Sequence, residues 1–206
     1  MSEQESESGS GTSVEYEELE ELYWQRVQEA RMSFSQADVD FMLAMIGHHA
    51  QALIMSELAP ENDASPQIQT LAARIINAQE DEIKSMQNWL HRRDQPVPEI
   101  HIDGLNLMLH GVEDEHHHNN HDMPGMLSQE QLETLSKATG REFDRLFLEF
   151  MIEHHQGAVT MVDNLFGTDG AAQDEDAFRL AADIHADQVT EIERMQQMLD
   201  RMASTD

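Results

Sequence analysis

The chain has 206 residues, enough for one substantial domain, and its 41 Asp and Glu against 12 Lys and Arg give a formal net charge of −29 at pH 7. This charge argues against partners that need a positive surface, such as nucleic acid or an anionic membrane. No apolar run approaches the ~20 residues of a membrane-spanning helix. Because Cys is absent, disulfides, thiolate metal sites, iron–sulfur clusters and a Cys nucleophile are excluded. The chain is instead rich in Met (14) and His (12).

The N-terminal region is predicted to be an acidic tail followed by a helix. The first 21 residues carry eight Glu and no Lys or Arg, which predicts a disordered segment over 1–14. Apolar residues at helical spacing, such as Leu19 and Leu22, then predict an accessory helix over 15–34 that packs on the outside of the main domain. No signal peptide is predicted, so a cytoplasmic protein and the trimmed part of an exported one both remain open.

The remainder of the chain contains an internal duplication. Residues spread over 38–55 recur 106 positions later, and a second block over 71–90 recurs 109 positions later. Two gap-free blocks in the same order are not expected by chance. The matched pairs of the first block are Asp38 and Asp144, Phe41 and Phe147, Met45 and Met151, Ile46 and Ile152, His48 and His154, His49 and His155, Ala52 and Ala158, and Met55 and Met161.

Each block is helical by its periodicity, and strand signals are essentially missing. Ser35 with Asp38 forms a capping-box pattern, Pro66 suits a first helical turn, and Ser128 with Gln131 predicts a short helix. The expected fold is therefore all-α, a four-helix bundle built from two duplicated helix pairs with an extra N-terminal helix. The four long helices are predicted over 36–58, 66–92, 142–166 and 175–202.

The expected domain covers residues 35–206. Its first helix pair occupies 35–93, and its second pair, with the short leading helix, occupies 128–206. Pro96 and Pro98 open the segment between them, so residues 94–127 are predicted to be an irregular linker rich in His and Met.

The repeated His-His pairs are the strongest candidate for a chemical site. Residues three, four and seven apart share one helix face, so Met and His form a single stripe in each copy. Thioether sulfur selects Cu(I), and imidazole suits copper in either oxidation state, so a Met/His set without Cys indicates copper or silver rather than zinc. Gln79 and Gln188 fall on inward stripes as further polar partners. The expected ligands are Met45, His48, His49, Met55, Met151, His154, His155 and Met161.

The linker offers a second, looser candidate site. Tracts rich in His bind transition metals with modest selectivity, although a solvated loop that merely contains many His residues would look the same. The stripe residues also have an alternative interpretation, because Met often fills cores and a buried His is often simply hydrogen-bonded. The candidate ligands of the linker are Met108, His110, His116, His117, His118, His121, Met123 and Met126.

The repeated pattern M-I-x-H-H-x-x-A-x-x-M, of which the second copy follows Met123-Pro124-Gly125-Met126, resembles the family known as domain of unknown function 305. The resemblance spans residues 35 to 202. It implies a ferritin-like four-helix bundle, usually exported to the periplasm or the cell exterior, with some members binding copper in copper resistance. Gly47, where the second copy has Glu153, is a departure that touches no candidate ligand.

The hypothesis from sequence is a copper-binding protein that buffers or sequesters Cu(I) or Cu(II) through Met and His, without catalysis. Its expected partners are metal ions and, as an open possibility, further copies of itself. Two alternatives stay open: a copper redox enzyme, either cupric reductase or cuprous oxidase, and a metal-free structural or interaction module. A ferritin-type di-iron centre is disfavoured, because Glu-x-x-His spacing occurs only in the linker.

Overall fold

The computed structural model describes residues 11–31, 33–111 and 123–204, and the chain is mostly helical. Met1–Ser33 and Phe34–Asp206 form two separate compact units. In the first unit, α1 (Gly11–Arg31) exposes large side chains such as Tyr16 and Trp24. The helix begins at Gly11, so the disordered tail expected over 1–14 is wrong for its last four residues. Packing of α1 on the main unit stays a prediction.

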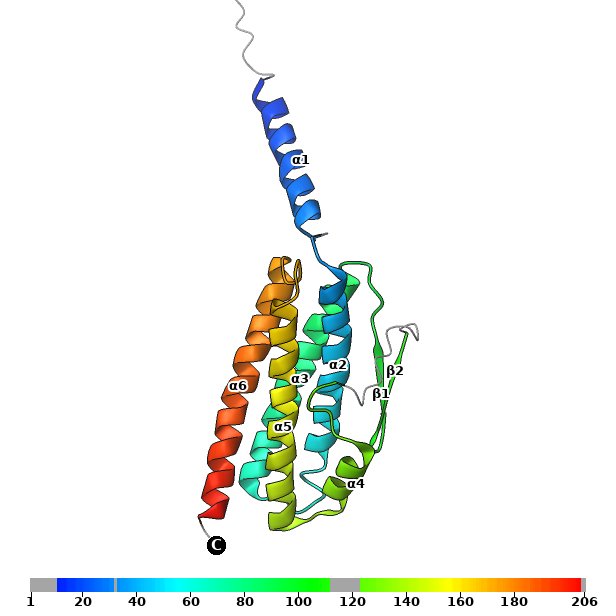
Figure 1. Cartoon of the computed structure of the whole chain (residues 1–206). Coiled ribbons are helices and arrows are strands. Elements are labelled where there is room, and N and C mark those ends of the chain that lie inside the picture. The colour runs from blue at the N-terminus through cyan, green and yellow to red at the C-terminus, as the bar shows by residue number, and fades with distance from the viewer. Residues whose placement is uncertain (1–10, 32, 112–122, 205–206) are drawn as a thin grey trace, which may run out of the picture. The chain divides into compact units, whose positions relative to one another are not determined.

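Four helices of the main unit pack as a bundle (Figure 1), and they lie close to their predicted ranges. The helix α2 packs against α3 and α5, and α6 packs against α5 and α3. None of the described helices is long and apolar enough to cross a membrane. The bundle helices are α2 (Gln36–Glu57), α3 (Pro66–His91), α5 (Gly140–Phe166) and α6 (Glu175–Ala203), and the short α4 (Gln129–Lys137) packs on α5.

Most of the predicted helix starts carry the expected capping bonds. The capping box of α2 is present, with the Asp38 backbone N–H donating to Ser35 Oγ at 3.2 Å and the Ser35 N–H donating to Asp38 Oδ2 at 2.7 Å. Ser128 and Gln131 form the same reciprocal pair at α4. At α3, Pro66 occupies the first turn as predicted, but the Ser65 side chain makes no capping hydrogen bond.

The first helix of each copy also holds the loop of the other copy. Asp38 Oδ1 accepts a hydrogen bond from the Ala172 backbone N–H at 2.7 Å, next to the start of α6. Its counterpart Asp144 accepts one from the Ser65 backbone N–H at 3.0 Å, next to the start of α3. Both carboxylates are buried. These reciprocal bonds relate the two helix pairs by an approximate twofold axis.

The linker contains a β-hairpin, so the prediction of an irregular segment is wrong over residues 99–110. Strands β1 (Glu99–Asp103) and β2 (Asn106–His110) pair antiparallel, and both contact α2. Apolar residues alternate with polar ones in both strands and are half-buried on one face. Gly104 adopts φ +59°, which suits the first position of a two-residue hairpin turn. Strands of five residues carry little periodic signal, and Met108 places an apolar residue on the outward face of β2.

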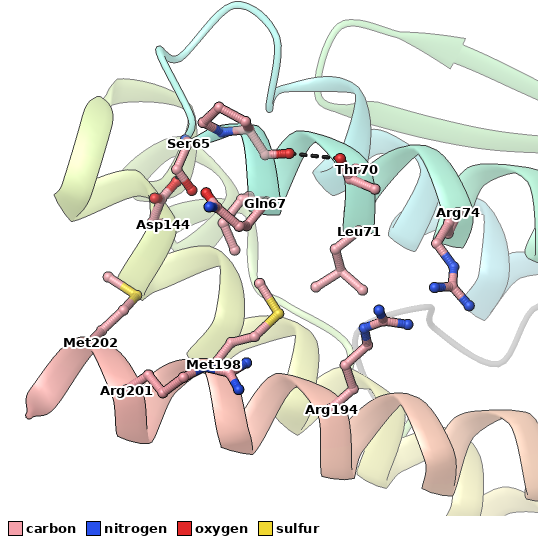
Figure 2. Close-up of a pocket in the computed structure, with 12 residues that line it drawn as sticks. Ser65, Gln67, Thr70, Leu71, Arg74, Asp144, Arg194, Met198, Arg201 and Met202 are labelled. Carbon is pink, nitrogen blue, oxygen red and sulfur yellow. Dashed lines mark hydrogen bonds between the residues drawn. The ribbon is translucent and has the colours of Figure 1, made fainter.

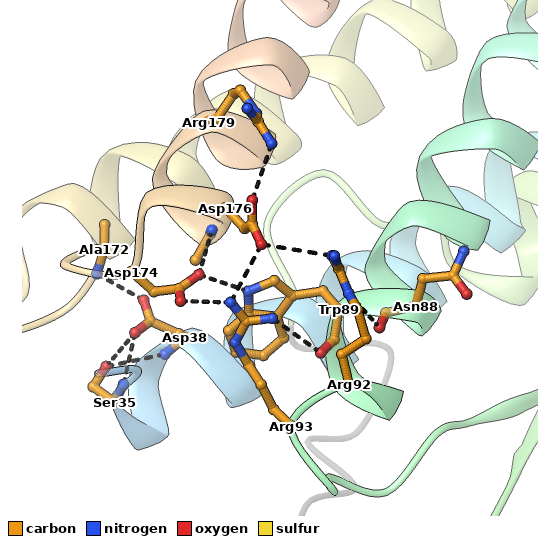
Figure 3. A network of polar contacts seen from close by, with 11 residues as sticks. Ser35, Asp38, Asn88, Trp89, Arg92, Arg93, Ala172, Asp174, Asp176 and Arg179 are labelled. Atoms are coloured by element: carbon orange, nitrogen blue, oxygen red, sulfur yellow. Dashed lines mark hydrogen bonds and ion pairs between the residues drawn. The ribbon is translucent and has the colours of Figure 1, made fainter. Parts of the chain in front are cut away.

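One end of the bundle is closed by a buried polar network between α3 and α6 (Figure 3). Asp174 caps α6 by accepting from the Ala177 N–H at 2.8 Å, and it also accepts from Trp89 Nε1 at 2.9 Å. Arg93 pairs with Asp174 and lies over the Trp89 ring, with its guanidinium carbon 4.4 Å from the ring centroid. Burial alone would raise the pKa of Asp174, but the hydrogen bonds from Arg93 and Trp89 hold this pKa below its usual value. The network fixes how the second helix of one copy meets the second helix of the other.

Candidate metal centre

The two His-His pairs meet in the interior of the bundle. His48 and His49 come from α2, His154 and His155 come from α5, and all four are 0% exposed. The rings of His48 and His154 lie face to face at a tilt, with centroids 3.9 Å apart. The structure therefore brings together the four imidazoles that the repeat singled out.

Three of these rings bond through Nε2 to a fixed oxygen. His49 Nε2 lies 2.7 Å from Glu82 Oε2, and His155 Nε2 lies 2.7 Å from Glu191 Oε2. His48 Nε2 lies 3.0 Å from the Pro124 carbonyl oxygen. A carbonyl or an ionised carboxylate can only accept, so Nε2 carries the proton in each neutral ring. These contacts assign a tautomer whose Nδ1 has a free lone pair.

The Nδ1 atoms have no hydrogen-bond partner among the described residues. This holds for all four histidines, and for His154 Nε2 as well. Amide atoms of Gln79 and Gln188, both 1% exposed, also have no hydrogen-bond partner in the described part of the chain. Burying a polar atom without a partner costs about 1–3 kcal/mol. So many in one interior indicate a place that takes a ligand or ordered water.

The imidazoles of His48 and His154 are neutral at ordinary pH. Burial, reinforced by the neighbouring His49, lowers the pKa of His48 to about 3. Burial also places the pKa of His154 well below its usual value, with His48 as the next cause. Because a metal binds only the neutral ring, this environment keeps the ligand form ready without deprotonation.

Methionines lie in the apolar core on both sides of the histidines. Met45 and Met161 belong to one buried cluster together with Met123, and Met126 packs against it. Met55 and Met151 belong to the other cluster. Each cluster thus combines one stripe Met from α2 with one from α5, as the approximate twofold requires. Since these side chains also fill the core, their position fits both metal binding and packing.

Across the described ranges 11–31, 33–111 and 123–204, no group of three or more His, Asp or Glu side chains could hold one metal ion. The four imidazoles are therefore not a preassembled carboxylate or polyhistidine site. A metal held here must use few ligands or include methionine sulfur.

A short linker segment covers the histidines. The Leu127 backbone N–H donates to Gln51 Oε1 at 2.8 Å, and Gln51 Nε2 donates to the Leu127 carbonyl at 3.0 Å. On α5, Gly157 lets the segment approach so closely that a Cβ there would lie 1.9 Å from the Pro124 oxygen. Met123 is thereby held beside the site, and Pro124 reaches His48.

Several of these contacts were not foreseen from the sequence. Glu82 and Glu191 hold the histidines, and Gln51 holds the linker. The two Glu residues recur as a matched pair in the second repeated block, which could have marked them. Gln51 has no such signal, because its counterpart is Gly157.

The candidate ligands of the linker do not gather at the bundle centre. Met108 and His110 lie on β2 with their side chains exposed. His116, His117, His118 and His121 lie outside the described residues. Met123 lies in the core cluster that contains Met45 and Met161, and Met126 packs against that cluster.

A pocket of about 580 Å³ between α3 and α6 has a different character (Figure 2). Its lining includes Arg74, Arg194 and Arg201 with Leu71 and Met198, and it contains no histidine. Three guanidinium groups repel a cation, so this pocket does not suit a metal ion.

Comparison with known proteins agrees with this fold. The sequence profile of the family named "Domain of unknown function (DUF305)" matches residues 38–199. None of the curated proteins matches the chain. A DUF305 fragment from Deinococcus radiodurans is 30% identical, with a TM-score of 0.65 over 82% of this chain and 98% of that one. A DUF305 protein from Streptomyces coelicolor is 24% identical, with a TM-score of 0.67 over 81% and 94%.

A third solved protein, CopM, has a metal in several of its structures. Its Cu(I)-bound form is 31% identical, with a TM-score of 0.57 over 80% of this chain and 96% of that one. CopM has also been solved with Cu(II) and with Ag. The match to the family profile extends over most of the chain, including both His-His motifs and the segment between them. The chain therefore belongs to the DUF305 family.

Proposed function

We propose that this protein binds copper in the bundle interior, through the Nδ1 atoms of the paired histidines and the sulfur of adjacent methionines. The observation that carries the proposal is the set of four buried Nδ1 atoms without partners among the described residues, on rings of which three already bond through Nε2. The Cu(I), Cu(II) and Ag forms of CopM support the same metals.

The donor set favours monovalent ions. Cu(I) and Ag(I) accept soft sulfur and low coordination numbers, whereas Zn(II) in a structural site takes four ligands in a tetrahedron. Met45 and Met151 stand one helical turn before the histidines of their own helices. Each can supply sulfur on the same face as its His pair. Gln79 and Gln188 can orient a bound water or a ligating ring.

The experiment is a competition titration of the full chain against a chromophoric Cu(I) chelator. The double variant H48Q/H154Q should lose the tight class of Cu(I) binding, whereas H91Q/H185Q, which changes two histidines on α3 and α6, should keep it. Circular dichroism verifies that each variant is folded. Unchanged tight binding in folded H48Q/H154Q would contradict the proposal.

The methionine contribution has its own test. M45L/M151L preserves side-chain volume, so the core should stay packed while the soft donors disappear. We expect Cu(I) and Ag(I) to bind at least tenfold more weakly and Zn(II) to bind unchanged. An equal effect on all three ions would assign these methionines to packing alone.

We further propose that the protein buffers or sequesters copper rather than turning it over. Stoichiometric binding without consumption of oxygen or reductant is the expected result. Sustained consumption in the presence of copper would instead favour a cupric reductase or cuprous oxidase.

A ferritin-like class for the bundle and an exported location complete the proposal. Both rest on the family resemblance, and the likeness to the Deinococcus radiodurans fragment and CopM supports the helical fold. Cell fractionation of the native protein tests the location.

A further inference from the structure

The β-hairpin carries metal-ligating side chains on its outer face. Its register pairs Glu99 with His110 and His101 with Met108. Because side chains alternate across a strand, these four residues share one face, and all four are exposed. The opposite face is half-buried, and there Ile100 packs against a core cluster of the bundle. The hairpin therefore presents its donors on a backbone that is seated against α2 (Figure 1).

The two histidines are close enough to share an ion. His101 and His110 are diagonal neighbours across the strands, and their ring centroids lie 6.3 Å apart with an interplanar angle of 46°. An ion about 2 Å from a ring nitrogen lies roughly 3 Å from the ring centre. Two rings on one ion can therefore have centroids up to about 6 Å apart. The observed separation of 6.3 Å is close to this upper limit.

Met108 supplies the donor that distinguishes this face. It lies directly opposite His101 and two residues before His110 on the same strand. Its side chain is 40% exposed, so it fills little of the core. Alternation of strand residues requires only that outward side chains be polar, and it gives no reason for a thioether here. Among the described residues no group of three His, Asp or Glu could hold an ion, so Glu99 does not complete a site with the two histidines, and Met108 is the remaining donor on this face.

We propose that the outer face of the β1–β2 hairpin is a second metal site, in which His101, His110 and Met108 bind one Cu(I) or Ag(I) ion. Two imidazoles and one thioether make a soft site that prefers these ions to Zn(II). The site is solvent-exposed, in contrast to the bundle centre, and it shares no ligand with it. The negative charge of the chain raises the local concentration of cations around it.

The test uses the full chain with His116, His117, His118 and His121 changed to Ala, so that the neighbouring histidines cannot bind. Ag(I) is titrated while the imidazole nitrogens and the methionine methyl groups are followed by NMR. His101, His110 and Met108 should shift together and saturate with one equivalent of Ag(I) beyond the amount that the bundle histidines bind. Separate saturation of these signals, or their movement only after several further equivalents, would overturn the proposal.

Variants in the same background locate the binding. H101A/H110A should bind one Ag(I) fewer, whereas the matched pair H91A/H185A should bind as many as the background. M108L should weaken Ag(I) binding about tenfold and leave Zn(II) binding unchanged. Unchanged stoichiometry in H101A/H110A would refute the hairpin site, and so would an equal loss in H91A/H185A. H48Q/H154Q should leave the hairpin signals as they are, so failure of the bundle proposal is recognised separately.

Discussion

The helix pairs α2–α3 and α5–α6 make the same contacts between their own helices but different contacts with the linker. In both copies the second His of the pair bonds a Glu on the next helix, His49 to Glu82 and His155 to Glu191, at the same distance of 2.7 Å. The first His differs, because His48 bonds the linker and His154 has no partner at either nitrogen among the described residues. Duplication thus produced a symmetric layer of four histidines, and the contacts of the linker make its two halves unequal.

The cause of the inequality is one pair of matched positions on the two helices. Gln51 on α2 is long enough to bond both backbone groups of Leu127. Gly157 on α5 has no side chain and admits Pro124 against the helix. Gln51 of the first copy therefore hydrogen-bonds the linker, and Gly157 of the second copy leaves space for it. Two Gln residues or two Gly residues at these positions could not both bond Leu127 and admit Pro124.

The largest effect is expected from filling the space at Gly157. Gly157→Val places a Cβ against the Pro124 backbone, which cannot move without losing its bond to His48. Overpacking of this kind costs about 3 kcal/mol in the free energy of unfolding, measured by urea denaturation. The control is Gln156→Val at an exposed position of the same helix, where we expect about 0.5 kcal/mol. If the two variants lost the same unfolding free energy, the packing of the linker against Gly157 would contribute no stability.

The second prediction concerns the His–Glu contact that the two copies share. Glu82→Gln and Glu191→Gln should each weaken Cu(I) binding about 10- to 100-fold, because the partner that fixes the tautomer is altered. Glu80→Gln, on the exposed side of α3, is the control for the lost charge. Competition titration measures all three. If all three variants lost affinity equally, overall charge rather than ring orientation would be responsible.

Acid should destabilise the metal-free protein through His48. Its pKa is about 3 in the folded state and about 6.5 in the unfolded state, so the unfolded chain alone binds the proton between these values. Stability is therefore complete above pH 6.5 and falls as the pH is lowered, by about 2 kcal/mol at pH 5. The rings around it, His49, His154 and His155, are buried with it. Denaturation of the wild type and H48Q at pH 7 and pH 5 measures the difference, which should be smaller in H48Q.

The smallest effect compares the matched carboxylates at the helix starts. Asp38→Ala removes a capping box and the bond from Ala172, and should cost about 2 kcal/mol. Asp144→Ala removes the bond from Ser65 and should cost about 1 kcal/mol. Thermal denaturation checks both values. A larger loss in Asp144→Ala would reverse the assigned order.

Much of the helical frame could be predicted because its signals are local. Helical periodicity and the Ser35 and Ser128 patterns placed α2 and α4, and the repeat indicated that His48 and His154 would face each other. The hairpin could not be predicted because five-residue strands carry a weak pattern, and Met108 places an apolar residue among the outward polar ones. The bond between His49 and Glu82 joins residues 33 positions apart. It depends on how α3 packs on α2, which a single sequence does not specify.

The central claim is that the bundle binds a monovalent metal through Nδ1. Silver nuclei couple to bonded nitrogen, so long-range proton–nitrogen NMR of the Ag(I)-loaded, nitrogen-15-labelled protein identifies the ligating atom directly. The account predicts coupling at Nδ1 of bundle histidines, with Nε2 of His49 and His155 still protonated. Coupling at Nε2 of those two rings, or the absence of coupling at all four bundle histidines in saturated protein, would contradict it.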